Sequence, residues 1–295
     1  MISIVIPAYN EENGITETIE KCKKLFSELG HENSEVIVVD DGSTDNTYEI
    51  GSKAGAITIR HPHNIGYGRS LKDGIIIAKN DIIVITDADG TYPLDRIPDL
   101  LKEYNLGFNM VVGARTGKHY DESFFKRINR KILKRLVEYT AGRKIADINS
   151  GLRIFSRTDI MPYFKSLCDT FSFTTSVTLA YMMTGKFVKY MPIDYHKRVG
   201  KTKVKLLRDA LRTLQFIVEA ILYYNPLKIF ILFSGILMIG SVLCFLLSAL
   251  AHLNTAFYIG IGCILLSILM FGLGLLSVQL KQILSNGQNY NHEKQ

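Results

Sequence analysis

Polar and acidic side chains gather in three short segments, each of which directly follows a run of apolar, β-branched residues. The segments are 7–12 (Pro-Ala-Tyr-Asn-Glu-Glu), 40–45 (Asp-Asp-Gly-Ser-Thr-Asp) and 86–90 (Thr-Asp-Ala-Asp-Gly). Any one of them fits a turn followed by a helix N-cap, a role that suits Ser43 and Thr44. Burying all three would be costly without a cation or a hydrogen-bonding ligand, so together they predict a binding site.

Two of these carboxylates are spaced to share a metal ion. Asp87 and Asp89 are separated by one residue, and alternate residues of an extended segment point the same way. A DxD pattern alone is weak evidence, but this one follows a predicted strand and accompanies two similar segments. Hard cations take oxygen ligands and keep positions open for substrate phosphates. The segment therefore predicts a Mg²⁺ or Mn²⁺ cofactor held by Asp87 and Asp89.

The elements that must hold these segments alternate between apolar runs and helical patterns. We predict strands over 2–6, 35–39, 56–60, 82–86 and 109–113. We predict helices over 16–29, 45–54, 69–79 and 94–104. This alternation indicates an α/β domain with a mostly parallel sheet covered by helices on both faces. Ligands of such sheets bind at the carboxyl ends of the strands, which is where the three polar segments lie.

The last part of the sequence is uniformly apolar. No Lys, Arg, Asp or Glu occurs from Ile229 to Leu280, and a polar break at 252–255 divides this run in two. Each half, about 229–250 and 256–278, is long enough at ~1.5 Å per residue to cross a ~30 Å hydrocarbon core. We therefore predict a transmembrane hairpin of two helices, with a buried soluble hairpin as the alternative.

Positive charge sets the expected orientation of this hairpin. Lys and Arg precede the first span and Lys281 follows the second, whereas the break at 252–255 has neither. The positive-inside rule then places both termini and the domain that precedes the hairpin in the cytoplasm; in a prokaryote the membrane would be the plasma (inner) membrane. Segment 204–222 repeats apolar residues at three- and four-residue spacing, which indicates an amphipathic helix at the membrane interface. Packing against the domain is the alternative.

Charge is unevenly distributed along the 295 residues. Residues 1–114 carry 10 basic and 18 acidic side chains, whereas 115–153 carry 11 and 4, and 186–212 carry 9 and 2. The acidic part suits a cation, and the basic blocks suit anionic lipid headgroups or a phosphorylated substrate. We expect no nucleic-acid partner, because no known nucleic-acid motif accompanies the basic blocks. The expected organisation is a cytoplasmic domain over 1–200, a juxtamembrane helix over 201–225 and the hairpin with a short tail over 226–295.

The three polar segments resemble the signature of family 2 glycosyltransferases with the GT-A fold. Segment 61–68 (His-Pro-His-Asn-Ile-Gly-Tyr-Gly) is similar to the Asn-x-Gly-x-Gly loop of that family. Segments 147–155 and 196–203 resemble its polyprenyl-phosphate branch, the dolichyl-phosphate mannose synthase-like enzymes. The two apolar segments are similar to the spans of bacterial members that make undecaprenyl-phosphate sugars.

This resemblance implies a Rossmann-like GT-A domain with a nucleotide-sugar site built from the three polar segments. It implies that Asp89 is the nearer of the two metal ligands, and that Asp41 either contacts the ribose or holds a turn. The implied nucleotide-sugar contacts are Pro7, Tyr9, Glu11, Asp40, Asp41, Asp87, Ala88 and Asp89.

The implied acceptor is a lipid phosphate, which is already largely ionised near neutral pH and needs little help from a general base. Cations must instead bring this anion to the donor. The candidates, each alternatively a bilayer-facing or solvated charge, are Arg115, Arg127, Arg198, Lys201 and Lys203. Asp147 is either a base or orienting group, or a turn residue paired with Arg143, Lys144 or Arg153. The expected catalytic residues are Asp89, Asp147 and Arg198.

The sequence thus predicts a metal-dependent inverting hexosyltransferase that uses a UDP-sugar, or secondly GDP-mannose, and undecaprenyl or dolichyl phosphate. One rival is a membrane glycosyltransferase with a hydroxyl acceptor, as in glycolipid or polysaccharide synthesis. Processive members of that kind carry a Gln-x-x-Arg-Trp segment, and this chain has no Trp. The other rival is a non-catalytic adaptor that binds nucleotide-sugar, against which the intact DxD argues. Membrane lipids are expected partners, and a homo-oligomer is left open.

Overall fold

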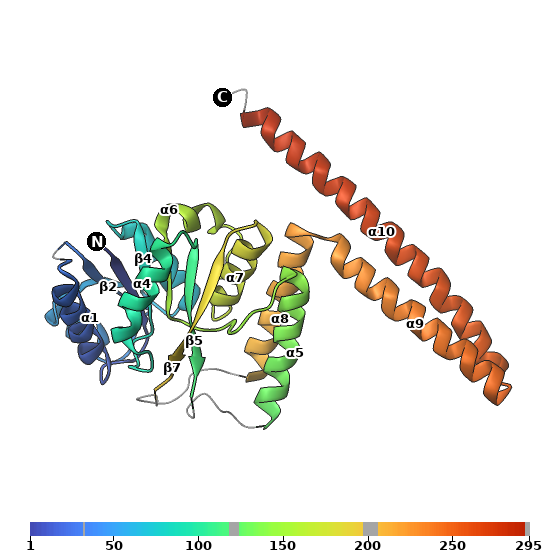
Figure 1. Cartoon of the computed structure of the whole chain (residues 1–295), viewed down its shortest axis with the longest axis horizontal. Helices are drawn as coiled ribbons and strands as arrows, with labels where there is room; N and C mark the ends of the chain where they lie inside the picture. The colour runs from blue at the N-terminus through green and yellow to red at the C-terminus, as the bar shows by residue number, and fades with distance from the viewer. Residues whose placement is uncertain (32, 118–123, 197–205, 293–295) are drawn as a thin grey trace. The chain divides into compact units, whose positions relative to one another are not determined.

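The computed structural model describes residues 1–31, 33–117, 124–196 and 206–292 (Figure 1). It divides into two compact units, Met1–Ile217 and Val218–Gln295, and helix α8 (Leu206–Tyr224) runs across the division. Three predicted site residues, Arg198, Lys201 and Lys203, lie outside the described residues.

The first unit is built on a seven-stranded sheet with the strand order β3-β2-β1-β4-β6-β5-β7. Strand β6 runs antiparallel to β4 and β5, and every other pair of neighbours is parallel. The strands are β1 (Ser3–Ala8), β2 (Glu35–Asp40), β3 (Ile57–Arg60), β4 (Ile82–Ile85), β5 (Met110–Thr116), β6 (Arg153–Ser156) and β7 (Val188–Asp194). The predicted α/β fold with a mostly parallel sheet is confirmed.

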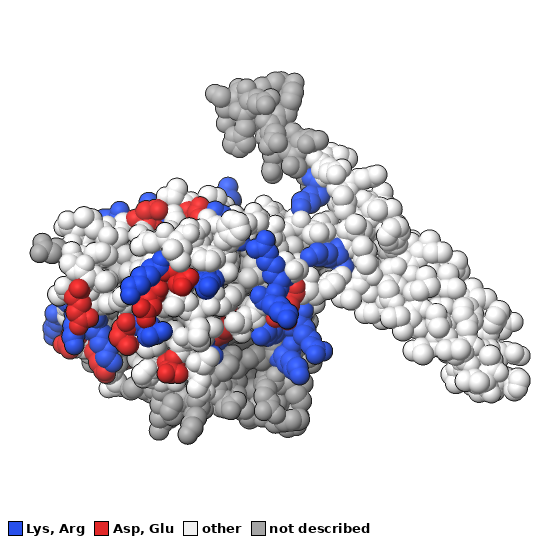
Figure 2. Space-filling view, in the orientation of Figure 1, with Lys and Arg blue, Asp and Glu red and all other residues white. Residues whose placement is uncertain are grey.

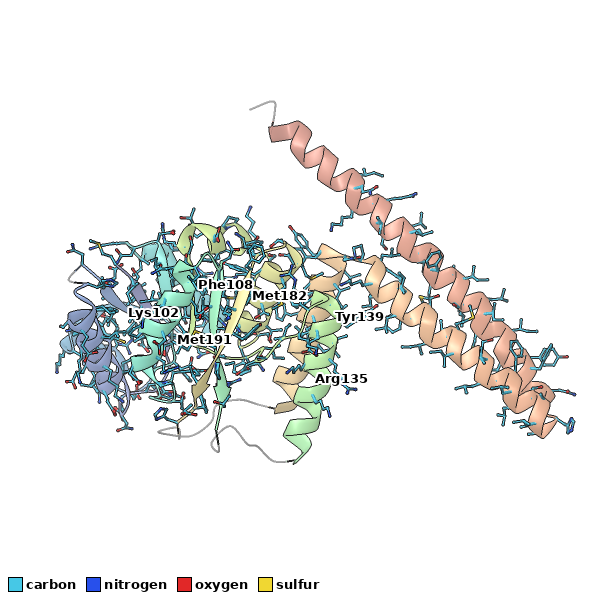
Figure 3. All side chains as sticks on the ribbon, in the orientation of Figure 1. Lys102, Phe108, Arg135, Tyr139, Met182 and Met191 are labelled. Atoms are coloured by element: carbon cyan, nitrogen blue, oxygen red, sulfur yellow. The ribbon has the colours of Figure 1, made fainter. Side chains whose placement is uncertain are left out.

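Helices cover both faces of this sheet because its strands are apolar on both sides. The even-numbered residues of β1 and β2 pack with α1 (Ile15–Leu29), η1 (Leu94–Arg96) and α4 (Ile97–Asn105) in one core. Partly buried side chains such as Phe108 and Met191 pack against this core (Figure 3). On the other face, Gly74 of α3 (Tyr67–Ile77) approaches Val5 and Val39 so closely that a larger residue would clash.

The remaining helices of the unit connect the strands. They are α2 (Thr47–Lys53), α5 (Phe124–Ala141), α6 (Arg157–Ile160), η3 (Met161–Tyr163) and α7 (Phe173–Met183). The strands and helices predicted from the sequence all occur, with ends that differ by at most three residues. The elements between residues 117 and 203 were not predicted individually, and the reversal of β6 had no counterpart in the predicted pattern. The helix predicted over 204–222 corresponds to α8.

The second unit is an antiparallel pair of long helices, α9 (Leu227–Ala251) and α10 (Asn254–His292). Serines join them: Ser234 Oγ lies 2.8 Å from Ser267 Oγ, and Ser241 Oγ donates to the Gly260 carbonyl at 2.9 Å. The mean hydropathy of the apolar windows is 2.7 and 2.5, and the outer surface shown in Figure 2 is almost free of charge. Both helices are candidate membrane spans by length and composition, as predicted for 229–250 and 256–278.

Candidate functional site

The loops that follow β1 and β2 are joined into one surface. The backbone N–H of Asn10 donates to Ser43 Oγ at 2.9 Å, and that of Glu11 donates to Thr47 Oγ1 at 2.8 Å. In return, the N–H of Thr44 donates to Asn10 Oδ1 at 2.8 Å. Ser43 therefore supports the neighbouring loop instead of capping α2. This bonding is possible because parallel neighbours β1 and β2 end at the same edge of the sheet.

Asp40 is the most deeply buried carboxylate at this edge. Its Oδ1 accepts a hydrogen bond from the Ser43 N–H at 3.1 Å. Its Oδ2 lies 3.3 Å from Arg60 Nε, an ion-pair distance, and has no hydrogen-bond partner among the described residues. A buried acceptor of this kind suits a ligand N–H or O–H. Pro7 lies within β1, and Tyr9 and Glu11 follow its end in partly exposed positions.

Asp41 is committed to the loop that resembles the Asn-x-Gly-x-Gly motif. Its Oδ1 accepts from the Ile65 N–H and its Oδ2 from the Gly66 N–H, both at 2.9 Å. His61 Nδ1 also lies 2.9 Å from Asp41 Oδ1. Of the two roles left open for Asp41, these contacts favour the one that holds a turn.

The DxD carboxylates lie directly beyond β4, whose neighbour β1 is parallel. Asp89 is 3% exposed, and its Oδ1 accepts from the N–H and the hydroxyl of Thr91, at 3.2 and 2.6 Å. Asp87 is partly exposed, and its Oδ1 accepts from the Tyr67 hydroxyl at 3.0 Å. The intervening Ala88 is buried, and its carbonyl accepts from Thr18 Oγ1 on α1. The loop therefore fixes both carboxylates at the same strand end.

Residues 3–164, more than half of the chain, match the family model for glycosyl transferase family 2. The chain belongs to this family. It is 30% identical over 220 residues to the low-salt glycan biosynthesis hexosyltransferase Agl6 of Haloferax volcanii, a match that covers 73% of this chain and 52% of that protein. It therefore spans about half the length of that relative.

Two further proteins are similar to this glycosyltransferase. The undecaprenyl-phosphate 4-deoxy-4-formamido-L-arabinose transferase of Salmonella newport is 26% identical over 247 residues, covering 81% of this chain and 73% of that enzyme. Glucosyl-3-phosphoglycerate synthase of Mycobacterium tuberculosis, solved with Mn²⁺, UDP and phosphoglyceric acid, has a TM-score of 0.62 at 20% identity. That match covers 75% of this chain and 78% of that structure, and it confirms the GT-A fold.

Arg115 of β5 and Asp147, in the loop that precedes β6, form a buried ion pair. Arg115 Nε donates to Asp147 Oδ2 at 2.7 Å, and Arg115 Nη2 donates to Asp147 Oδ1 at 2.9 Å. Burial alone would raise the pKa of Asp147, but the Arg115 guanidinium and two backbone N–H donors outweigh it, so the pKa lies below its ordinary value. The partner is therefore Arg115, and not Arg143, Lys144 or Arg153 as the turn alternative supposed.

The loop from Asp147 to Gly151 is attached to several elements at once. Thr175 of α7 donates to Asn149 Oδ1 at 2.9 Å, and the Gly151 N–H donates to the Tyr92 hydroxyl at 2.6 Å. A Cβ added at Gly151 would lie 2.9 Å from Asp87 Oδ1. The loop thus forms a wall against the DxD segment, and any side chain at Gly151 would displace Asp87.

Arg153, the first residue of β6, holds this loop through side-chain hydrogen bonds. It is 0% exposed, and it donates to the carbonyls of Ser150 and Ile148 at 2.8 and 3.0 Å and to Thr178 Oγ1 at 2.8 Å. Sequence reasoning considered Arg153 only as a partner of Asp147. A charged residue inside the apolar run Leu152–Phe155 was the available signal, because such a residue is buried only with several acceptors.

Of the five basic residues predicted to bind the acceptor phosphate, only Arg115 has a side chain that the structure describes. Arg115 is paired with Asp147 and lies over the Tyr195 ring, 5.5 Å from its centroid. Arg127 belongs to α5, and its side chain lies outside the described residues, as do Arg198, Lys201 and Lys203. Phosphate binding by these residues stays a prediction.

Proposed function

We propose that this glycosyltransferase moves a sugar from a nucleotide-sugar to a polyprenyl phosphate, with inversion, at the cytoplasmic face of a membrane. A UDP-sugar is the first choice of donor and GDP-mannose the second. The Salmonella relative, named for a sugar transfer to undecaprenyl phosphate, supports this acceptor class. The two candidate membrane spans support it as well, because they would keep the catalytic unit beside a lipid acceptor.

The observation that carries the proposal is the pairing of Asp147 with Arg115. A general base for a sugar hydroxyl works best with a pKa near the operating pH. The pKa of Asp147 is lowered instead, and both of its oxygens accept hydrogen bonds from Arg115 side-chain nitrogens. A phosphate acceptor needs no such base, since its second pKa is about 6 in phosphorylated side chains. In this proposal Asp147 orients Arg115 and the loop before β6.

The donor half of the site follows from the three polar segments. Tyr9 would stack on the nucleoside base, and Glu11 and Asp40 would accept hydrogen bonds from the base or the ribose. The Oδ2 of Asp40, which has no hydrogen-bond partner among the described residues, suits that role. Pro7 and Ala88 would shape the floor, and Asp41 would hold the adjoining loop.

A divalent cation fits the DxD segment. Within the described residues no three His, Cys, Asp or Glu side chains form a complete metal cluster. Two carboxylates at one strand end, Asp87 and Asp89, nevertheless match the way Mg²⁺ is held by one or two carboxylates plus substrate phosphates. Mn²⁺ or Mg²⁺ held there would offset negative charge on the departing nucleoside diphosphate. Asp89 is the proposed nearer ligand, fixed by Thr91.

The acceptor half would use the basic residues of the chain. Arg198, Lys201 and Lys203 directly precede α8, and Arg115 and Arg127 complete the set. In the proposed orientation the catalytic unit lies on the cytoplasmic side of the membrane, where anionic lipids and the lipid phosphate are both found. Arg198, as an Arg, can engage two phosphate oxygens where Lys supplies a point charge.

The test is a transfer assay with the purified full-length protein in detergent. Undecaprenyl phosphate, Mn²⁺ and a panel of labelled UDP-sugars and GDP-mannose are supplied, and organic-extractable label is measured. Label should appear with one donor, disappear in excess chelator, and disappear when undecaprenol replaces the phosphate. The anomeric configuration of the product, read by NMR, checks inversion. Efficient labelling of the free alcohol would overturn the proposal in favour of a hydroxyl acceptor.

Two variants sharpen this assay. Arg198→Ala and Lys203→Ala should each raise the KM for undecaprenyl phosphate roughly 10- to 100-fold, since charge-assisted hydrogen bonds contribute about 1.5–3 kcal/mol. The KM for the donor should change much less. Lys24→Ala is the matched control, because Lys24 is an exposed cation on α1. Equal KM values for undecaprenyl phosphate in all three variants would show that Arg198 and Lys203 do not bind the acceptor.

A further inference from the structure

A tyrosine from the loop after β3 reaches the DxD segment. Tyr67 is the first residue of α3, and its hydroxyl donates to Asp87 Oδ1 at 3.0 Å. The residue is partly exposed, and its hydrogen bond to Asp87 is partly buried. The hydroxyl donates and the carboxylate accepts, so this contact ties one oxygen of Asp87 to α3.

The backbone that carries Tyr67 is held on its N-terminal side. Asp41 accepts from the N–H groups of Ile65 and Gly66, the two residues before it. His61 lies between two carboxylates, 2.9 Å from Asp41 Oδ1 and 3.1 Å from Asp73 Oδ2. Asp73 belongs to α3 itself. The loop and the helix that follows are thus tied to the same end of β2.

The same helix is held on its other side by the segment before α7. The N–H of Arg69 donates to the Asp169 carbonyl at 2.8 Å, and the buried Lys72 Nζ donates to Asp169 Oδ1 and to the Leu167 carbonyl, both at 2.6 Å. A Cβ at Gly68 would lie 2.2 Å from the Cys168 carbonyl oxygen, so only glycine permits this approach. Helix α3 therefore cannot move Tyr67 away from Asp87 without breaking several contacts.

We propose that Tyr67 is a positioning residue that holds the Asp87 carboxylate in one orientation for the metal. The hydroxyl fixes Oδ1 from one side, and Gly151 lies so near that an added Cβ would be 2.9 Å from the same oxygen. A ligand that is held before the metal arrives loses less freedom on binding. Outer partners of metal ligands typically contribute 10- to 100-fold to metal affinity. This inference rests on the proposed assignment of Asp87 to the metal.

The experiment compares three variants of the full-length protein in detergent, titrated with Mn²⁺ in the presence of UDP. Tyr67→Phe removes only the hydroxyl, and we expect Mn²⁺ affinity to fall about 10-fold. Transfer at limiting Mn²⁺ should fall in parallel and recover as Mn²⁺ is raised to saturation. Tyr181→Phe is the control, because Tyr181 is fully buried and its hydroxyl has no hydrogen-bond partner among the described residues. It should bind Mn²⁺ as the unmodified protein does. Asp87→Asn should lose most of the affinity.

The outcomes distinguish the positioning role of Tyr67 from the assignment of Asp87 to the metal. If Asp87→Asn loses Mn²⁺ and Tyr67→Phe binds it normally, the positioning role is wrong and the metal assignment stands. If Asp87→Asn binds Mn²⁺ normally, the proposed metal site fails and the role of Tyr67 fails with it. A Tyr67→Phe defect that excess Mn²⁺ does not relieve also overturns the positioning role, since it would report a general loss of structure.

Discussion

Arg115 and Asp147 join β5 to the loop before β6 through two parallel hydrogen bonds of 2.7 and 2.9 Å, with Asp147 only 4% exposed. A further hydrogen bond, from the Arg115 backbone N–H, ends on the same carboxylate. One residue of β5 thus holds the loop with both its side chain and its main chain. Because Gly151 of this loop lies next to Asp87, the pair links the geometry of the DxD segment to that of β5.

The first prediction concerns the pH dependence of this pair. The folded-state pKa of Asp147 lies below the unfolded value of about 3.9, so its contribution to stability is present above that value and is lost as the pH falls through the folded pKa. Asp147→Asn should therefore lower the Tm most at pH 6–7, and the difference from the unmodified protein should shrink below about pH 4. Thermal scans by circular dichroism measure this. Asp95→Asn, at an exposed position, is the control. A Tm difference that stays constant with pH would contradict the prediction.

The second prediction concerns the buried Arg153. Arg153→Met fills similar space and removes a buried charge, but it leaves the Ile148 and Ser150 carbonyls without their donors. Each such loss costs about 1–3 kcal/mol, so we expect a net destabilisation of about 2–4 kcal/mol. For a domain of this size the Tm should fall by roughly 4–16 °C. Arg96→Met should change the Tm little, since its ion pair with Asp99 is exposed and worth about 1 kcal/mol or less. Equal Tm values for both variants would contradict the role given to Arg153.

A third prediction tests the wall beside the DxD segment. The methyl group of Gly151→Ala would lie 2.9 Å from Asp87 Oδ1, and the carboxylate must rotate to relieve the contact. The fold should survive, whereas the Mn²⁺ concentration for half-maximal activity should rise about 10-fold, as for other disturbed partners of metal ligands. Gly51→Ala is the matched control, because the three atoms nearest to its methyl would be side-chain atoms of Thr58 and Val38, at 3.3 Å or more. If the metal dependence of Gly151→Ala is unchanged, this loop does not influence metal binding.

The fourth prediction concerns the orientation of the hairpin. If the positive-inside rule holds, the turn between α9 and α10 lies outside the cytoplasm, and the end of α10 lies inside it. Asn254→Cys should react with a membrane-impermeant maleimide in intact cells. Gln282→Cys, an exposed position on α10, should react only after the cells are permeabilised. The reverse pattern would place the catalytic unit on the other side of the membrane, where it could not use a nucleotide-sugar from the cytoplasm.

Local patterns predicted much of the first unit because its early elements alternate regularly. The strand predicted at 35–39, for example, is apolar on both faces from Val36 onward, and the structure extends it by one residue, to Asp40. The pairing of Asp147 was out of reach, because nearby Arg143 and Lys144 fit the pattern equally well and the true partner lies 32 residues away. Tyr67 was seen only as part of a glycine-rich loop. Its contact with Asp87 depends on how α3 packs, which no local spacing reveals.

The reversed strand β6 has a practical consequence for anyone who wishes to modify this protein. Because β6 is antiparallel to β4 and its first residue, Arg153, lies beside Ile85 at the end of β4, the loop before it lies at the same edge as the DxD segment. The opposite edge of the sheet is left with turns that contain none of the site residues discussed above. One of them, at Leu106–Gly107, is well exposed: Leu106 is 74% exposed, and Gly107 has nothing within 4 Å of an added Cβ. A fluorescent reporter or affinity tag inserted there should leave the site intact, so transfer and metal binding can be followed on a labelled enzyme.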